Sequence, residues 1–260
     1  MKKRDLYISK ILPFVDKPVI KVITGIRRSG KSALLMLLKD YLIEKGTAFD
    51  NIIYINFESM EFGDIETAKD LYSYIIMRKP QNCKCYILLD EIQNVKEWER
   101  AVNSFQVDID CDIYITGSNS QLLSSELSTL LAGRYVEFVI ETLSFSEYLD
   151  FKDDEEKDIY KLFSQYLKLG GFPAIHAYNY DVDSAYKIVS DIYSSVILRD
   201  TIQRHNIRNV DQLNRIMRFI LVNIGNLFSA KSISDYFVSQ KRKIDVNTVY
   251  NYLSALENAY

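Results

Sequence analysis

The chain has 260 residues, a formal net charge of −3 and 48% hydrophobic residues. These values are ordinary for a soluble globular protein of one large domain or a few small ones, and they exclude a disordered chain. The charge is uneven, because residues 199–260 hold nine basic and five acidic residues, a net of +4 against −7 for the remainder. This distribution favours an anionic partner for the C-terminal part, although a solvated helix face explains the same charges equally well.

The sequence shows no signal for a membrane or for export. It contains no apolar run long enough to span a bilayer, and no leader with a small-residue cleavage site. Its three cysteines, Cys83, Cys85 and Cys111, give neither a disulfide framework nor a usual metal-ligand spacing. We therefore expect a cytoplasmic protein with reduced thiols and no membrane partner.

Residues 25–32 read Gly-Ile-Arg-Arg-Ser-Gly-Lys-Ser, which is a complete P-loop pattern. An apolar, β-branched run at 19–24 precedes the loop, and a leucine-rich helical pattern over 31–45 follows it. In this context the glycines let the backbone approach an anion closely, and the helix N-terminus directs free N–H groups at it. A plain glycine turn does not explain the Lys-Ser pair, so we expect a nucleotide-phosphate site.

The residues of the loop have separate expected roles. The Lys31 ammonium is predicted to bridge the β- and γ-phosphates and so to take part in catalysis, and the Ser32 hydroxyl to ligate Mg²⁺. Arg27 and Arg28 either touch phosphate or brace the loop. The predicted nucleotide-binding residues of this region are Gly25, Ile26, Arg27, Arg28, Ser29, Gly30, Lys31, Ser32 and Ala33.

Four more segments have the composition of strands, and helical patterns separate them. The predicted strands are 51–57, 85–91, 112–116 and 135–140, and the predicted helices between them are 66–77, 95–107 and 118–131. Strands that alternate with helices indicate βαβ units and a parallel sheet with helices on both faces. The predicted fold class is therefore α/β, of the P-loop NTPase type, up to about residue 145.

The third predicted strand ends in Asp90 and Glu91 after four apolar residues. Asp90 is placed to hold Mg²⁺ beside the P-loop, and Glu91 to polarise a water for in-line attack on the γ-phosphate. Turn polarity is the alternative, but it does not account for an acidic pair about sixty residues after a P-loop. The strand 51–57 comes between the two motif strands in the chain, as in the ASCE division of P-loop proteins, where the two are not neighbours.

Polar residues also follow the fourth predicted strand. Asn119, or alternatively Ser118, is a candidate catalytic sensor of the γ-phosphate or the attacking water, although a helix N-cap explains these residues as well. Arg134 is either an arginine finger or the local partner of a carboxylate. His176 and His205 have no partners at metal-ligand spacing, so we expect structural or surface roles for them.

The last sixty residues have a helical pattern of their own. Residues 207–223 form an amphipathic stripe, and Ser232 is a candidate cap of the short helix that follows. The final predicted helix begins near Thr248 and exposes Asn251 and Tyr252. Three such helices indicate a helix-turn-helix, although any small helical bundle shows the same pattern.

Taken together, these motifs resemble a prokaryotic family of AAA-like P-loop ATPases, similar to the archaeal ATPase and STAND branch. The segments that carry the resemblance are 25–32, 88–93, 116–120, 131–134, 143–148, 170–173 and 248–253. The resemblance implies an AAA-like core at 1–145, a helical lid at 146–205 and a winged-helix domain at 206–260, with ATP and Mg²⁺ as ligands. It also implies an adenine contact at Pro173, because a Gly-x-Pro turn lies near the adenine in the STAND branch.

Members of this family usually continue into a further C-terminal domain, so the resemblance implies a truncated chain. The first functional hypothesis is an Mg²⁺-dependent ATPase that drives or gates a movement of the lid and winged helix. The alternatives are a slow nucleotide-dependent switch and a regulator that binds DNA through residues 199–260. A metabolite kinase fits the Asp-Glu pair less well. A homo-oligomer or a protein partner is compatible with each hypothesis.

Overall fold

The chain folds into two compact units, 1–185 and 186–260, and the division falls within helix α8 (Val182–Tyr193). Each unit has buried apolar clusters of its own. Ser118, Asn119 and His205 lie outside the described residues. The computed structural model describes residues 2–81, 83–117, 131, 133–152, 158–195, 201–204, 207–242 and 244–257.

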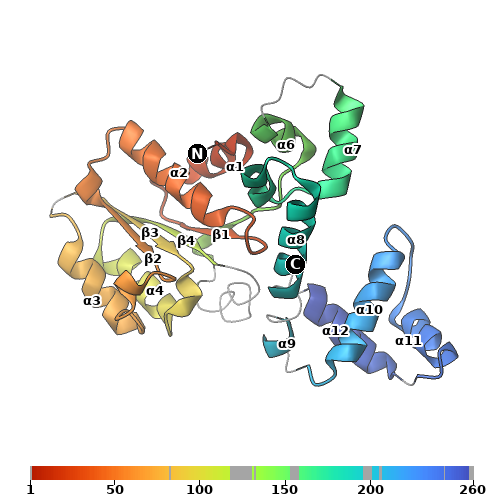
Figure 1. Cartoon of the computed structure of the whole chain (residues 1–260). Coiled ribbons are helices and arrows are strands. Elements are labelled where there is room, and N and C mark those ends of the chain that lie inside the picture. The colour runs from red at the N-terminus through yellow and green to blue at the C-terminus, as the bar shows by residue number, and fades with distance from the viewer. Residues whose placement is uncertain are drawn as a thin grey trace. The chain divides into compact units, whose positions relative to one another are not determined.

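A parallel sheet, with five strands among the described residues, forms the centre of the first unit (Figure 1). Its strands are β1 (Ile20–Thr24), β2 (Ile52–Asn56), β3 (Cys85–Asp90), β4 (Cys111–Thr116) and β5 (Tyr135–Val139). The spatial order is β2-β3-β4-β1-β5, and every neighbouring pair is parallel. The predicted parallel α/β class is therefore confirmed, and the two motif strands, β1 and β3, are separated as expected. The strand between them in the sheet is β4, whereas β2 lies at the edge.

Helices cover both faces of this sheet (Figure 1). α1 (Asp5–Ile11) and α2 (Lys31–Glu44) pack on one face, and α3 (Ala68–Arg78) and α4 (Trp98–Asp108) pack on the other. α1 was not predicted from the sequence; it is a short helix that buries Tyr7 and Ile11 one turn apart. Single 3₁₀ turns occur at Leu12–Phe14, Phe49–Asn51, Met60–Phe62 and Ile92–Asn94.

After β5, the described residues of the first unit are mainly helical and pack through aromatic side chains. They form α6 (Phe145–Lys152), α7 (Ile159–Leu169) and a 3₁₀ helix, Pro173–Tyr178. The turn before this 3₁₀ helix lies against the backbone of Leu143, whose N–H donates to the carbonyl of Gly171 at 2.7 Å. A Cβ on Gly171 would lie 2.4 Å from the Leu143 carbonyl oxygen, so the close approach requires glycine.

A buried ion pair lies near the amino ends of the strands. Lys21 of β1 and Asp112 of β4 are both fully buried and pair with each other. Asp112 also accepts hydrogen bonds from the hydroxyl of Tyr114 and from the backbone N–H of Asp16, both at 2.8 Å. Burial lowers the pKa of Lys21, and the bond to Asp112 opposes that effect. Each charge of the pair is thus satisfied inside the protein.

In the second unit, the described residues form helices that pack around a small core. The helices after α8 are α9 (Thr201–Arg204), α10 (Val210–Val222), α11 (Ala230–Ser239) and α12 (Val246–Glu257). Among the described residues, no helix has both the length and the apolar character that a membrane span needs. Buried residues of this core include Leu213, Ile216, Ile233, Phe237 and Val249.

Two details expected for this unit are wrong. The N-cap of α11 is Ser229, whose hydroxyl accepts from the N–H of Ser232 at 3.0 Å, and Ser232 is the third helical residue of a capping box. Tyr252 is only 8% exposed and belongs to the core. It lies three residues after Val249 and therefore shares the buried face of α12.

Candidate functional site

The P-loop connects β1 to α2, and its backbone requires glycine at its first position. Gly25 has φ +138°, and a Cβ there would lie 2.1 Å from the carbonyl oxygen of Ile140. The N–H of Ile140 donates to the Thr24 carbonyl at 2.8 Å, which fixes the chain after β5 beside the loop. Gly30, with φ +102°, is the N-cap of α2. The first N–H groups of α2 therefore face the concave side of a tightly curved loop.

Lys31 begins α2, and its side chain is turned back into the loop. The residue is 4% exposed, and its ammonium donates to the carbonyls of Gly25 at 2.9 Å and Ile26 at 3.2 Å. Burial lowers the pKa of this ammonium, while the carboxylates of Glu91 and Asp90 work to raise it. A buried cation thus lies within the field of both predicted acidic residues.

Asp90 ends β3 and is fully buried beside the start of α2. Its Oδ1 accepts from the hydroxyls of Ser32 at 3.1 Å and Thr116 at 2.5 Å, and its Oδ2 accepts from the hydroxyl of Tyr54 at 3.3 Å. Burial raises the pKa of Asp90, and these hydrogen bonds oppose the rise. The structure therefore brings together Ser32 and Asp90, the two residues predicted to hold a metal ion.

This pair fits Mg²⁺ that arrives with a nucleotide. Mg²⁺ is bound in such sites by one or two carboxylates together with phosphate oxygens and waters. The described residues contain no cluster of three or more His, Cys, Asp or Glu side chains that could hold a metal ion by themselves. One carboxylate beside one hydroxyl next to the loop therefore matches a site for Mg²⁺ bound together with a nucleotide, and the phosphates and waters would supply the other ligands.

Glu91 follows Asp90 and turns away from the strand. Its backbone is left-handed, with φ +56°, and its N–H donates to the hydroxyl of Thr116 at 3.0 Å. Its carboxylate accepts a hydrogen bond from the side-chain amide of Gln93. Thr116 thus bonds to both acidic residues, a role that the sequence analysis missed. A polar residue at the end of β4, directly after Ile113, Tyr114 and Ile115, was the available signal.

The other predicted loop residues differ in how exposed they are. Arg27 is about half exposed and forms an ion pair with Glu58 at 3.6 Å, after the end of β2. Arg28 is exposed and has a left-handed backbone, with φ +65°. Ala33 lies in the first turn of α2. The hydroxyl of Ser29 is buried without a hydrogen-bond partner, so a polar atom remains unsatisfied inside the loop.

Arg4 is a buried residue of this region that the sequence analysis missed. Its guanidinium forms a bidentate pair with Glu147 of α6, at 2.8 and 3.0 Å. It also donates to the carbonyls of Ser29 at 2.9 Å and Glu141 at 3.0 Å. Burial acts to raise the pKa of Glu147, but Arg4 and the backbone of Ser144 outweigh it and hold that pKa below its ordinary value. Arg4 therefore connects the N-terminal segment, the P-loop and α6.

Pro173, the predicted adenine contact, lies next to the P-loop. A Cβ at Gly30 would be 3.9 Å from Cγ of Pro173 and 4.0 Å from Nη1 of Arg4. The segment that begins at Pro173 is thus at the rim of the loop. This placement joins residues that are more than 140 positions apart in the chain.

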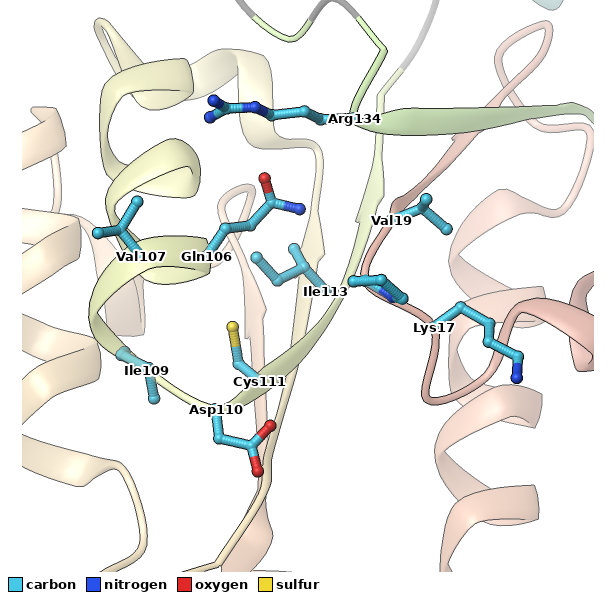
Figure 2. A pocket seen from close by; sticks show the side chains of 10 residues that line it. Lys17, Val19, Gln106, Val107, Ile109, Asp110, Cys111, Ile113 and Arg134 are labelled. Atoms are coloured by element: carbon cyan, nitrogen blue, oxygen red, sulfur yellow. The ribbon is translucent and has the colours of Figure 1, made fainter.

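Arg134 lies at the amino ends of the strands, opposite the end that carries the P-loop. Its carbonyl accepts from the N–H of Ile20, at the start of β1, so the length of β1, about 16 Å, separates its backbone from the loop. Figure 2 shows it beside a pocket of about 430 Å³ that also includes Lys17 and Cys111. Its guanidinium donates to the side chain of Asn103 at 3.4 Å. Arg134 therefore does not reach the phosphate site of its own chain.

His176 has a structural position, as expected. Its Nδ1 lies within hydrogen-bonding distance of the hydroxyl of Tyr180, and its ring packs on Tyr148 and Phe151. Burial lowers its pKa to about 4, with a smaller contribution from Lys2. The imidazole is therefore neutral near pH 7.

A parallel sheet with the order found here, a glycine-rich loop before α2 and an Asp-Glu pair at the end of β3 define a P-loop NTPase of the AAA-like class. A family model described as an AAA domain matches residues 17–149, and the chain belongs to that family. A second model, described as a domain of unknown function, matches residues 160–260.

The chain also has relatives among curated proteins. An uncharacterized protein of Haemophilus influenzae is 41% identical over 263 residues, which cover 100% of this chain and 65% of the relative. An uncharacterized protein of Methanocaldococcus jannaschii is 34% identical over 270 residues, which cover 99% of this chain and 57% of the relative. The chain thus spans about three fifths of the length of these relatives.

Solved structures of similar fold include two that carry ligands. AMPPCP-bound DnaA from Aquifex aeolicus is 13% identical, with a TM-score of 0.41 and coverage of 96% of this chain and 85% of that one. The Aeropyrum pernix ORC1 protein in complex with DNA is 12% identical, with a TM-score of 0.38 and coverage of 100% and 84%. Likenesses this distant carry no argument about the ligands of this chain.

Proposed function

We propose that this chain binds ATP with Mg²⁺ at the P-loop and hydrolyses it. The observation that carries the proposal is the 3.1 Å hydrogen bond between Ser32 and Asp90 beside the buried ammonium of Lys31. A hydroxyl, a carboxylate and a cation at the N-terminus of one helix form the combination that a triphosphate and its metal require.

In this proposal each residue has a defined task. Backbone N–H groups of residues 25–33 hold the phosphates, and Lys31 exchanges its two carbonyl partners for phosphate oxygens. Ser32 and Asp90 hold Mg²⁺, which neutralises phosphate charge when it is bound. Glu91 accepts a proton from the attacking water, and Asn119 is the proposed sensor that orients that water. Pro173 contacts the adenine.

The proposed output of ATP binding is a movement of the segments after the core. We assign the core to 1–145, the lid to 146–205 and a winged-helix-like domain to 206–260. The contacts that support the coupling are those of Arg4, which joins Ser29 of the P-loop to Glu147 of the lid. A ligand that reshapes the loop would change the acceptors of this guanidinium and hence the position of α6.

Nucleotide binding by the whole chain tests the first step. We expect wild-type protein to bind labelled ATP in the presence of Mg²⁺, and Lys31→Ala to weaken that binding. Lys45→Ala is the matched control, because it removes the same charge from the exposed end of the same helix. Equal ATP affinity in the two variants would contradict the assignment of Lys31.

A second candidate is a slow nucleotide-dependent switch, in which binding rather than turnover is the output. The observation that favours it is the hydrogen bond from Gln93 to the carboxylate of Glu91, which occupies the proposed base. If this bond restrains the base, Gln93→Ala raises the rate of a single turnover of bound ATP. An unchanged rate in Gln93→Ala removes the structural reason for the switch.

Cytoplasmic location, a homo-oligomer and DNA as a partner of residues 199–260 stay part of the proposal. The support for DNA is the net charge of +4 in that segment. A phosphate-backbone binder loses affinity steeply as salt increases, so a salt titration of duplex binding tests it. Binding that does not change with salt would contradict a role for these charges.

A further inference from the structure

The second unit contains a groove between α10 and α11 that the proposed ATPase activity does not use. Its larger pocket has a volume of about 550 Å³. The side chains that characterise it are cationic, aromatic or carboxamide in type. They include Arg218, Phe219, Asn223, Tyr236, Gln240 and Arg242.

A second pocket continues this groove along α10. It has a volume of about 400 Å³ and begins at Asn209, just before the first residue of that helix. The two pockets share Arg215, Phe237 and Arg242, so they are adjacent. The combined groove follows the 13 residues of α10, a length of about 20 Å. This length fits an extended polymer better than a single compact ligand.

The groove is rich in positive charge. Arg215, Arg218 and Arg242 line it, and one carboxylate, that of Asp211, partly neutralises them. Asp211 contacts Arg215 at 2.7 Å and Arg242 at 4.0 Å, and it also lies within the field of Arg218, so one acidic group faces three basic ones. Guanidinium groups present several donors in a plane and are well suited to phosphate.

An exposed aromatic ring lies among these cations. Tyr236 is 46% exposed, and its ring centroid is 5.0 Å from that of Phe219, with the two rings tilted by 51°. Phe219 in turn packs edge-on against Phe228 at 6.1 Å. An exposed ring that packs against other aromatic rings offers a face on which a nucleobase stacks, and stacking beside arginines is typical of sites for single-stranded nucleic acid.

α12 is the helix that a helix-turn-helix would place in the major groove, and its composition differs from that of the groove. α12 contains no Lys or Arg, and its one charged residue is Glu257. Its Tyr252 is buried, so that residue is not available to a base edge. Duplex recognition usually inserts a protruding helix into the major groove and neutralises the flanking phosphates. The basic and aromatic side chains here line a concave groove instead.

We propose that the groove between α10 and α11 binds single-stranded nucleic acid, with phosphates on Arg218 and Arg242 and a base stacked on Tyr236. Gln240 lines the same pocket, and in this proposal its amide contacts the edge of such a base. The side-chain amide of Asn223 donates to the Phe219 carbonyl at 2.8 Å and so shapes the pocket instead. This inference does not depend on the ATP site, since every residue it uses belongs to the second unit.

The test measures fluorescence anisotropy of a labelled oligothymidine with the whole chain over a range of salt concentrations. Two variants remove groove groups, Tyr236→Leu and Arg218→Gln. Lys231→Gln is the matched control, because Lys231 is an exposed cation of α11 that does not line either pocket. The same strand annealed to its complement, and a labelled polyglutamate peptide, serve as competing ligands.

We expect Tyr236→Leu to weaken oligothymidine binding at least about fivefold, as the loss of one stacked base does. Arg218→Gln should reduce the slope of log affinity against log salt by about 0.7, the value for one phosphate contact on a single strand. Lys231→Gln should change neither quantity. Arg218 is exposed, so its variant decides the question if Tyr236→Leu fails to fold.

Three results would overturn the proposal. The first is equal affinity of wild type, Arg218→Gln and Lys231→Gln for oligothymidine. The second is tighter binding of the duplex with no effect of Tyr236→Leu, which would indicate a backbone contact without stacking. The third is binding of polyglutamate but not of either nucleic acid, which would assign the groove to an acidic peptide.

Discussion

A buried lysine and a buried aspartate lie at each end of the central strands, and the two ends use these charges differently. At the amino ends of the strands, Lys21 and Asp112 pair directly, and hydroxyl and N–H groups complete the network. At the carboxyl ends of the strands, Lys31 bonds to loop carbonyls and Asp90 bonds to hydroxyls. The first arrangement is closed and stabilises the fold. The second keeps two charges on exchangeable neutral partners, as a site for a charged ligand requires.

The largest effect on stability should come from breaking the closed pair. Lys21→Met leaves Asp112 buried without its cation, which costs about 3–5 kcal/mol. Chemical denaturation should show this loss as a lower midpoint. The double variant Lys21→Met/Asp112→Leu should recover much of it, because both buried charges are then gone. A single variant as stable as wild type would contradict the account of this pair.

Stability should respond in the opposite sense at Asp90, which bonds to neutral hydroxyls and not to a cation. Asp90→Asn removes a buried carboxylate whose pKa burial raises, so the free energy of unfolding should stay the same or rise, by up to about 1 kcal/mol. The same change should remove the Mg²⁺ dependence of ATP binding. Thermal melts and ATP titrations with and without Mg²⁺ measure both. A large loss of stability would show that Asp90 is a structural residue like Asp112.

The Arg4–Glu147 pair has a smaller expected effect on stability than the Lys21–Asp112 pair, and it joins stability to the site. Glu147→Gln keeps the shape but removes the charge that the guanidinium faces, at a cost of about 1–3 kcal/mol. Because Arg4 also holds the carbonyl of Ser29, ATP affinity should fall as well. Asp70→Asn, an exposed capping change on α3, is the control and should leave ATP affinity unchanged. Loss of stability with unchanged ATP affinity would separate this pair from the loop.

The smallest predicted effect is a dependence on acid at His176. Burial lowers its pKa from 6.5 to about 4, so the unfolded chain binds more protons between these values. Its contribution is therefore fully present above pH 6.5 and is lost as the pH falls toward 4. His176→Gln should make the decline in unfolding free energy over this range less steep. An identical decline in wild type and variant would show that other groups cause it.

The sequence predicted the parts of the site that are contiguous in the chain. The P-loop, the strand ending in Asp90 and Glu91, and the alternation of strands and helices are local patterns, and the structure has them in the expected order. Arg4 and Glu147 are 143 positions apart, and no local pattern connects them. The role of Thr116 depends on β4 lying next to β3, which is a property of the sheet order.

Two further differences have local causes. The helix predicted over 95–107 begins at Trp98, because Glu97 has a left-handed backbone with φ +55° and a 3₁₀ turn precedes it. Tyr252 was expected on an outer face, but tyrosine is amphipathic and its ring fills the small core. Its hydroxyl reaches the Asn209 carbonyl at 3.4 Å, so the polar end stays satisfied.

The most direct test of the central claim is a single turnover of bound ATP by Glu91→Gln, with Glu97→Gln as an exposed control. The account predicts that Glu91→Gln retains ATP and Mg²⁺ but hydrolyses the nucleotide about 10²–10⁴-fold more slowly than wild type, the usual contribution of a positioned base. Glu97→Gln should hydrolyse it at the wild-type rate. Hydrolysis by Glu91→Gln at the wild-type rate would contradict the claim that the carboxyl ends of the strands form an ATPase site with Glu91 as its base.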